Sequence, residues 1–288
     1  MFVNTHFADT LGKSYRLFNG GKIMYIYKEP ALITEQFILP SKGKFYGDSF
    51  DGTLTLRAMT TVEERMRTGT DDFYSVMPEI VNRCIVDNMN EDGTYKIDSR
   101  RFTIFDFDAV CVKLRIISYG PLYETTAICT SCGHKFKYKA DLRELDFNFV
   151  PDDFVEPYTI GPLPSSGDTL GCRFLRVQDR IDINKKAMEI KLKDSNYIGK
   201  PEVELEMLHR IMTINGESVD SIMGTKYIQH MIAMDTQYYK DNIDTEFYGV
   251  VKTGITDCTN TINGKQCEGK AIYLVRADDE FFRAKSNY

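Results

Sequence analysis

The segment Cys129-Thr-Ser-Cys132-Gly-His134 is the most informative stretch of this chain. Two thiols separated by two residues and followed by a glycine are typical of a knuckle, in which a tight turn points both sulfurs at one metal ion. A structural Zn²⁺ prefers four ligands in a tetrahedron, so one such pair predicts a second. Cys258 and Cys267, with eight residues between them that include Asn263-Gly264, are the candidates for that second pair.

The two pairs together predict a structural zinc site formed by Cys129, Cys132, Cys258 and Cys267, which joins distant parts of the chain. The second pair is wider than the roughly two to four residues typical of ribbon knuckles. Two alternatives therefore stay open: His134 replaces one of the cysteines, or the site is degenerate and has lost its metal. Four sulfur ligands would fill the coordination sphere, so we do not expect a catalytic metal.

The composition is that of an ordinary folded protein, with 288 residues that are 42% hydrophobic and 27% charged. The net charge of -6 argues against a general nucleic-acid surface, which needs clustered cations. No apolar run reaches the roughly 18 residues of a membrane span, and the N-terminus lacks the pattern of a signal peptide. We therefore expect synthesis in the cytosol, where paired cysteines indicate a metal more often than a disulfide. Cys84 and Cys111 are expected to be core residues, and Cys172 has no pairing pattern.

Local patterns divide the chain into four regions. Residues 1–60 look extended, and Tyr15–Phe18, Asn19-Gly20-Gly21 and Lys22–Tyr27 predict a β-hairpin. Residues 61–125 look helical. Residues 126–145 together with 250–288 form the zinc-ribbon-like module. Residues 146–249 are an insertion that is first loop-rich and then helical, with helices predicted over 177–193, 202–214 and 225–243. The sequence thus predicts an α+β fold: an N-terminal β-hairpin or extended arm, a helical middle, and a zinc-ribbon-like β element that clasps a helical insertion.

Two helices in the middle region have clear boundary signals. Thr61 and Glu64 fit a capping box at the start of a short helix. A longer helix is predicted after Asp106 or Asp108, either of which could cap it. That helix ends where Gly120 precedes Pro121, and we expect Gly120 at positive φ.

Motifs for catalysis are missing from the sequence. It contains no Gly-rich phosphate loop, dinucleotide fingerprint or Gly-x-Ser-x-Gly elbow, and no His-Glu-x-x-His. The acidic residues of the helical segments are accounted for by capping or by solvated faces. We therefore do not expect an enzyme. The alternation of Lys and aromatic residues over 135–139 suggests a strand that binds nucleic acid, but a ribbon strand with solvated lysines accounts for it better in an acidic chain.

An ordered series of short motifs resembles the baseplate hub subunits and hub assembly proteins of T4-like tailed bacteriophages. The similarity is clear over about residues 37–145 and weaker over 170–283. Its most specific part is the helix that ends in Arg115-Ile-Ile-Ser-Tyr-Gly-Pro121, followed by the knuckle. The other motifs are Leu39-Pro-Ser-Lys-Gly43, Leu54-x-Leu-Arg57-x-Met59, Thr61-x-Glu-Glu-x-Met66, Asp141-Leu142, the late cysteine pair and Asp278-x-x-Phe-Phe282.

The resemblance implies a structural role in the central hub of a contractile tail baseplate, through contacts with other baseplate and tail proteins in a multi-subunit assembly. It implies a location in the virion tail after synthesis in the host cytoplasm. The net charge and the lack of a long apolar run predict no nucleic-acid partner and no membrane. The zinc would then stabilise a small β element that lacks a core of its own. Two alternatives stay open: an assembly chaperone that is absent from the mature particle, and a zinc-ribbon regulator that binds nucleic acid.

Overall fold

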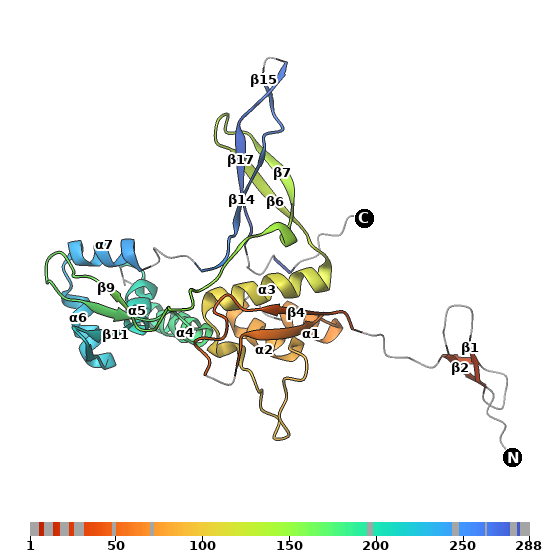
Figure 1. Ribbon diagram of the computed structural model, residues 1–288, viewed down its shortest axis with the longest axis horizontal. Coiled ribbons are helices and arrows are strands. Elements are labelled where there is room, and N and C mark those ends of the chain that lie inside the picture. The colour runs from red at the N-terminus through yellow and green to blue at the C-terminus, as the bar shows by residue number, and fades with distance from the viewer. Residues whose placement is uncertain are drawn as a thin grey trace. The chain divides into compact units, whose positions relative to one another are not determined.

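The computed structural model divides the chain into two units, residues 1–33 and residues 34–288. The positions that it describes are 6–8, 14–17, 23–25, 32–47, 50–69, 72–194, 198–243, 248–262, 264–276 and 281–282. The fold is mixed α+β, as predicted, with helices and several small antiparallel sheets (Figure 1). The four-region division drawn from the sequence stays a prediction.

The first unit contains one three-stranded antiparallel sheet in the order β1-β2-β3. Its strands β2 and β3 pair with Tyr15 opposite Tyr25, which confirms the predicted hairpin. The Asn19-Gly20-Gly21 turn lies outside the described residues. The bounds of the strands are His6–Ala8 for β1, Ser14–Leu17 for β2 and Ile23–Tyr25 for β3.

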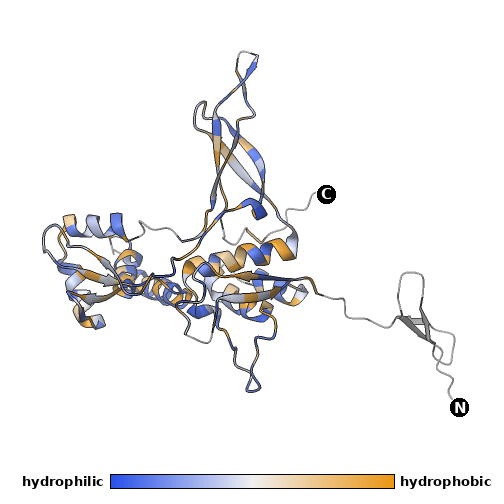
Figure 2. Cartoon of the chain, viewed as in Figure 1, coloured by the Kyte–Doolittle hydropathy of each residue, from blue (hydrophilic) through white to orange (hydrophobic). Residues whose placement is uncertain are grey.

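Helix α3, Ile104–Tyr119, is the centre of the second unit. Figure 2 shows it largely in hydrophobic colours, and Phe107, Val110 and Leu114 on it are fully buried in the main core. An isolated helix with so little polar surface would be unstable in water, so it needs neighbours all round. Its N-cap is Thr103, whose hydroxyl accepts from the amide of Asp106, so the predicted cap at Asp106 or Asp108 is wrong.

Gly120 closes α3 at φ 85° and ψ 168°, a conformation that only glycine adopts without strain. The predicted positive φ is therefore confirmed. The capping box of α1, Thr61–Thr68, is present one residue earlier than predicted, with Thr60 and Glu63 in place of Thr61 and Glu64. The hydroxyl of Thr60 accepts from the amide of Val62, and the carboxylate of Glu63 accepts from the amide of Thr60. The duplicated Thr-Thr and Glu-Glu pairs offer both registers, and only the path of the preceding strand selects one.

Helices and strands from the first half of this unit surround α3. The hairpin of β4 and β5 contributes Leu54 and Leu56 to the core, and α2 contributes Ile80 and Val81. The short pair β8 and β13 joins residues on either side of the insertion. The bounds are Thr34–Ile38 for β4, Thr53–Arg57 for β5, Thr61–Thr68 for α1, Phe73–Cys84 for α2, Ser99–Arg101 for η1, Leu142–Glu144 for η2, Phe147–Asn148 for β8 and Gly249–Val250 for β13.

The insertion contains a sheet as well as helices. Four strands in the order β12-β11-β10-β9 form it, and a second core includes Leu170, Met207 and Tyr239. The sequence predicted only loops and helices here, because strands of two to four residues are too short to show alternation. The bounds are Tyr158–Ile160 for β9, Leu170–Cys172 for β10, Val177–Lys193 for α4, Pro201–Arg210 for α5, Ile211–Ile214 for β11, Glu217–Ser218 for β12, Ser221–His230 for α6 and Ala233–Asn242 for α7.

The four cysteines belong to a separate four-stranded antiparallel sheet, in the order β14-β17-β6-β7. Two hairpins that are far apart in sequence form it, and the β17–β6 pairing joins them with Ile272 opposite Ile128. The bounds are Leu122–Cys129 for β6, Lys135–Asp141 for β7, Thr253–Asp257 for β14, Thr261–Ile262 for β15, Lys265–Gln266 for β16 and Lys270–Leu274 for β17. We call this sheet, with its tip hairpin β15–β16, the ribbon.

Candidate metal centre

Each hairpin of the ribbon carries one cysteine pair at its tip. Cys129 is the last residue of β6, and Cys132 lies in the turn before β7. The turn is closed by the amide of Gly133, which donates to the carbonyl of Cys129 at 3.0 Å. Gly133 has φ 70°, so the glycine reverses the chain in the way that the knuckle pattern predicted.

The second pair is wide in sequence because its gap folds as a small hairpin of its own. Strands β15 and β16 lie between Cys258 and Cys267 and pair with each other. The amide of Cys267 donates to the carbonyl of Asn260 at 2.8 Å, which closes the base of this extension. Cys258 and Cys267 are thereby brought together much as a short turn would bring them, and the long spacing does not count against a shared site.

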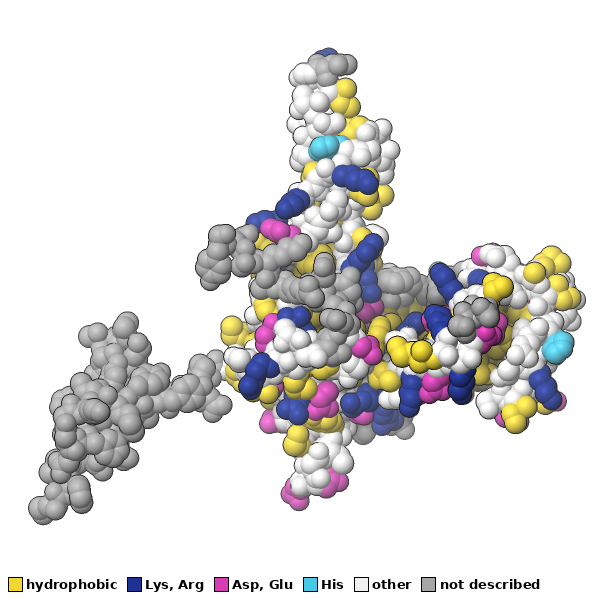
Figure 3. Space-filling view, turned by 180° about the vertical axis from the view of Figure 1, so that it is seen from behind, with side chains coloured by type: hydrophobic (Ala, Val, Ile, Leu, Met, Phe, Trp, Pro, Cys, Tyr) yellow, Lys and Arg dark blue, Asp and Glu magenta, His cyan; other side chains and the backbone are white. Residues whose placement is uncertain are grey.

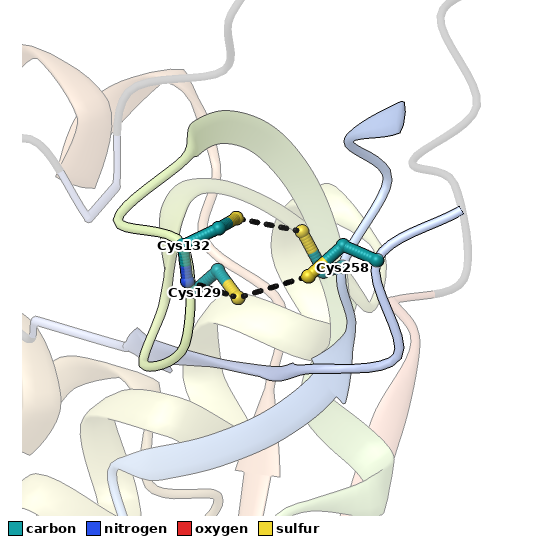
Figure 4. A group of neighbouring side chains, drawn as sticks. Cys129, Cys132 and Cys258 are labelled. Carbon is teal, nitrogen blue, oxygen red and sulfur yellow. Dashed lines mark hydrogen bonds between the residues drawn. The ribbon is translucent and has the colours of Figure 1, made fainter. Parts of the chain in front are cut away.

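The four sulfurs lie within 4.8 Å of one another. Figure 4 shows Cys129, Cys132 and Cys258 turned toward a common point. The sulfurs of Cys129 and Cys267 are 3.9 Å apart, and those of Cys132 and Cys258 are 3.7 Å apart. A disulfide needs about 2.05 Å, whereas a tetrahedron with Zn–S bonds of about 2.3 Å has edges of about 3.8 Å. The observed distances fit four ligands around one ion.

Backbone amides point at the sulfurs. The amide of Asn260 donates to the sulfur of Cys258 and the amide of Gly269 to that of Cys267, each at 3.4 Å. The amide of His134 is the largest of several donors that lower the pKa of the Cys132 thiol to about 6. At Cys258 and Cys267 the amides also lower the pKa, but burial and the neighbouring cysteines outweigh them and raise it. Such donors favour the thiolate, which is the form that ligates a metal. The two hairpins thus bring the four sulfurs to the right spacing and direct backbone amides at three of them.

The arrangement is suited to a structural ion. Within the described residues, the metal-compatible group consists of the four cysteines alone, which leaves no position for a reacting water. His134 does not join it; its ring stacks on Phe136 with centroids 5.7 Å apart. The remaining cysteines, Cys84, Cys111 and Cys172, are fully buried elsewhere. Burial raises the pKa of Cys84 to about 12, so that thiol stays neutral.

Two polar side chains on α3, which the sequence did not single out for this role, bind the segments that lead into and out of the ribbon. Asp108 forms an ion pair at 2.5 Å with Lys252, which is the residue directly before β14. Arg115 is buried and donates to the carbonyls of Gly120 at 2.8 Å and of Phe281 at 3.0 Å. The only sequence signal for these contacts is an arginine among aliphatic helix residues, because a buried cation needs hydrogen-bond acceptors. Its partner 166 residues away has no local signature.

Asp106 attaches the N-terminal end of α3 to the loop after β4. Its carboxylate accepts from the amide of Ser41 at 2.9 Å and from the hydroxyl of Tyr46. Burial raises the pKa of this carboxyl, while these donors oppose that rise. Asp106 and Asp108, the two aspartates at the predicted start of the helix, therefore bind residues that are distant in sequence and do not cap the helix.

Comparison with known families gives one result. A model of the T4 bacteriophage base plate proteins matches residues 32–282. No curated protein and no solved structure matches the chain. The match covers the surroundings of α3, the insertion and both cysteine pairs. The chain belongs to the T4 bacteriophage base plate protein family.

Proposed function

We propose that this protein is a structural component of the central hub of a contractile phage tail baseplate and acts through protein contacts. The family match over residues 32–282 carries the proposal, because the family consists of base plate proteins; a location in the virion tail is the part of the proposal that this match supports. The hub position is our inference from the ordered motifs that resemble hub subunits and hub assembly proteins, of which the most specific is the helix end Arg115–Pro121 followed by the knuckle. None of the helices in the described part of the chain has the length and apolar character to cross a bilayer.

We also propose that the ribbon binds one structural Zn²⁺ through Cys129, Cys132, Cys258 and Cys267, and that the protein has no catalytic activity. The sulfur distances and the amide donors support the zinc. When bound, the ion would add folding free energy and tie β6–β7 to β14–β17. The residues themselves hold the four thiols at the tips of two hairpins and direct amides toward them, and the ion needs no further ligand.

Quantitative mass spectrometry of purified particles tests the role, scaled to a tail protein of known copy number. A fixed small-integer copy number is expected for a baseplate component. Presence in infected cells together with absence from particles would contradict it and would favour an assembly chaperone. Binding of the purified protein to DNA or RNA at low salt would instead support the nucleic-acid regulator.

A further inference from the structure

One face of the ribbon exposes a row of isoleucines. Ile255, Ile272 and Ile128 lie opposite one another on β14, β17 and β6. Their exposed fractions are 69%, 46% and 45%, and Leu274, two residues from Ile272, is 40% exposed. Single exposed aliphatic residues are ordinary, but neighbours on adjacent strands form a continuous apolar patch.

Lysines border this patch on the edge strand β7. Lys135 lies opposite Ile128, and Lys137 follows on the same face. Both are exposed, and within the described part of the chain neither forms an ion pair. The third, Lys139, pairs with Glu124 at 3.5 Å. Figure 3 shows Lys and Arg side chains together with hydrophobic ones along the ribbon. We call Ile128, Ile255, Ile272 and Leu274, with Lys135 and Lys137, the ribbon face.

The aromatic residues of the ribbon lie on its other face. Tyr138 and Tyr273 contact each other with ring centroids 4.8 Å apart, and Phe136 alternates with the lysines along β7. Binding of single-stranded nucleic acid combines cations with stacking rings on one surface. Here the cations share their face with aliphatic side chains, which suits a protein surface better.

We propose that the ribbon face docks another protein of the baseplate, whose contact surface is apolar at its centre and acidic at its border. This inference rests on the proposed structural role. Apolar burial at the centre and complementary charge at the rim are the usual anatomy of such contacts. A second copy of this chain fits less well, because the acids on the same face, Glu124, Asp141 and Asp257, are already in ion pairs.

Site-specific photo-cross-linking in infected cells tests the proposal with the full-length chain. A benzophenone amino acid replaces Ile255 in one variant and Ile222 on α6 in a matched control, since both residues are 69% exposed. We expect position 255 to give an adduct with one other baseplate protein, through a peptide that contains both apolar and acidic residues, and position 222 to lack that adduct. Equal adducts from both positions, no adduct, or adducts only with nucleic acid or a second copy would overturn it.

Charge reversal gives an independent measurement. Lys135→Glu with Lys137→Glu should lower the yield of the adduct from position 255 at least about tenfold, because like charges would then face each other across the contact. The control reverses two exposed lysines of the insertion, Lys185→Glu with Lys226→Glu, and should leave the yield unchanged. An unchanged yield in the ribbon variant would overturn the acidic border.

The two experiments distinguish a wrong docking surface from a wrong structural role. If the chain is present in particles but position 255 gives no adduct, the ribbon face is not the docking surface and the structural role stands. If the chain is absent from particles but position 255 still captures a baseplate protein, the docking surface stands and the role is that of a chaperone.

Discussion

The surroundings of α3 and the ribbon are stabilised in different ways. Around α3, strands and helices bury Phe107, Val110 and Leu114 completely, so apolar burial provides the stability. The ribbon is a single sheet that leaves Ile255 and Ile272 exposed, and its four thiols meet at the hairpin tips. The ribbon buries only one face of its sheet in the main core, through small side chains such as Ala127, Ala140 and Ala271. Burial therefore contributes less there, and a bound metal would add stability. We therefore expect that only the stability of the ribbon depends on a metal.

Loss of the metal should have the largest effect, and only on the ribbon. Cys132→Ser leaves an incomplete tetrahedron, and zinc binding is worth on the order of 10 kcal/mol in small zinc-dependent folds. We expect thermal unfolding of the variant at lower temperature, with no further change when a chelator is added. Cys172→Ala, which removes a buried thiol outside the cluster, should keep the response to chelator. Identical melting of Cys132→Ser and the unmodified chain would remove the metal from the account.

A cavity beside α3 should have the next largest effect. Phe107 is fully buried, and the centroid of its ring lies 6.2 Å from the ring centroids of Phe73 and Tyr74. Phe107→Ala should cost about 3–5 kcal/mol in the free energy of unfolding, from lost burial and from the cavity left behind. Denaturant unfolding measures it, with and without chelator. A loss that depends on the chelator would show that the two regions are not independent.

The end of α3 offers a smaller test. Gly120→Ala places a side chain at φ 85° and ψ 168°, which should cost about 1–3 kcal/mol. Gly69 closes α1 at an ordinary φ of -80° and is the matched control. Gly69→Ala should change the stability by less than about 1 kcal/mol. Equal losses in the two variants would show that α3 does not need glycine at its end.

The capping box of α1 should have the smallest effect and a distinct pH dependence. The pKa of Glu63 is lowered to about 2: burial raises it, but bonds from Arg57 and Thr60 outweigh burial. A lowered folded-state pKa contributes stability above the unfolded value of about 4.5, and that contribution is lost as the pH falls toward 2. Glu63→Gln should cost about 1 kcal/mol at neutral pH. The difference in melting temperature between the two proteins should shrink between pH 4.5 and pH 2; a constant difference would argue against the ionised pair.

The sequence was informative where the chemistry is local. The paired thiols, the hairpin over residues 15–25 and the glycine that ends α3 each depend on neighbours within a few positions. It was misleading where one element passes directly into another: the predicted helix over 202–214 ends at Arg210, and Ile211–Ile214 forms β11. Likewise, the predicted helix over 225–243 is two helices, α6 and α7, separated near Met231.

Long-range partners could not be predicted from one sequence. Asp106, Asp108 and Arg115 bind groups that lie 65, 144 and 166 residues away. Spacing on a helix shows which residues share a face, but not which distant segment meets that face. The candidate metal centre could be predicted despite separations of 126 and 138 residues, because thiol pairs need a common ion and that requirement links the two pairs.

Hydrogen exchange of the purified full-length chain, with and without chelator and with the zinc content measured in parallel, tests the central claim most directly. We predict one zinc per chain. Removing it should speed exchange in β6, β7, β14 and β17 and leave the amides of α3 protected. Zinc-free protein with an equally protected ribbon, or a loss of protection that extends through α3, would contradict the account.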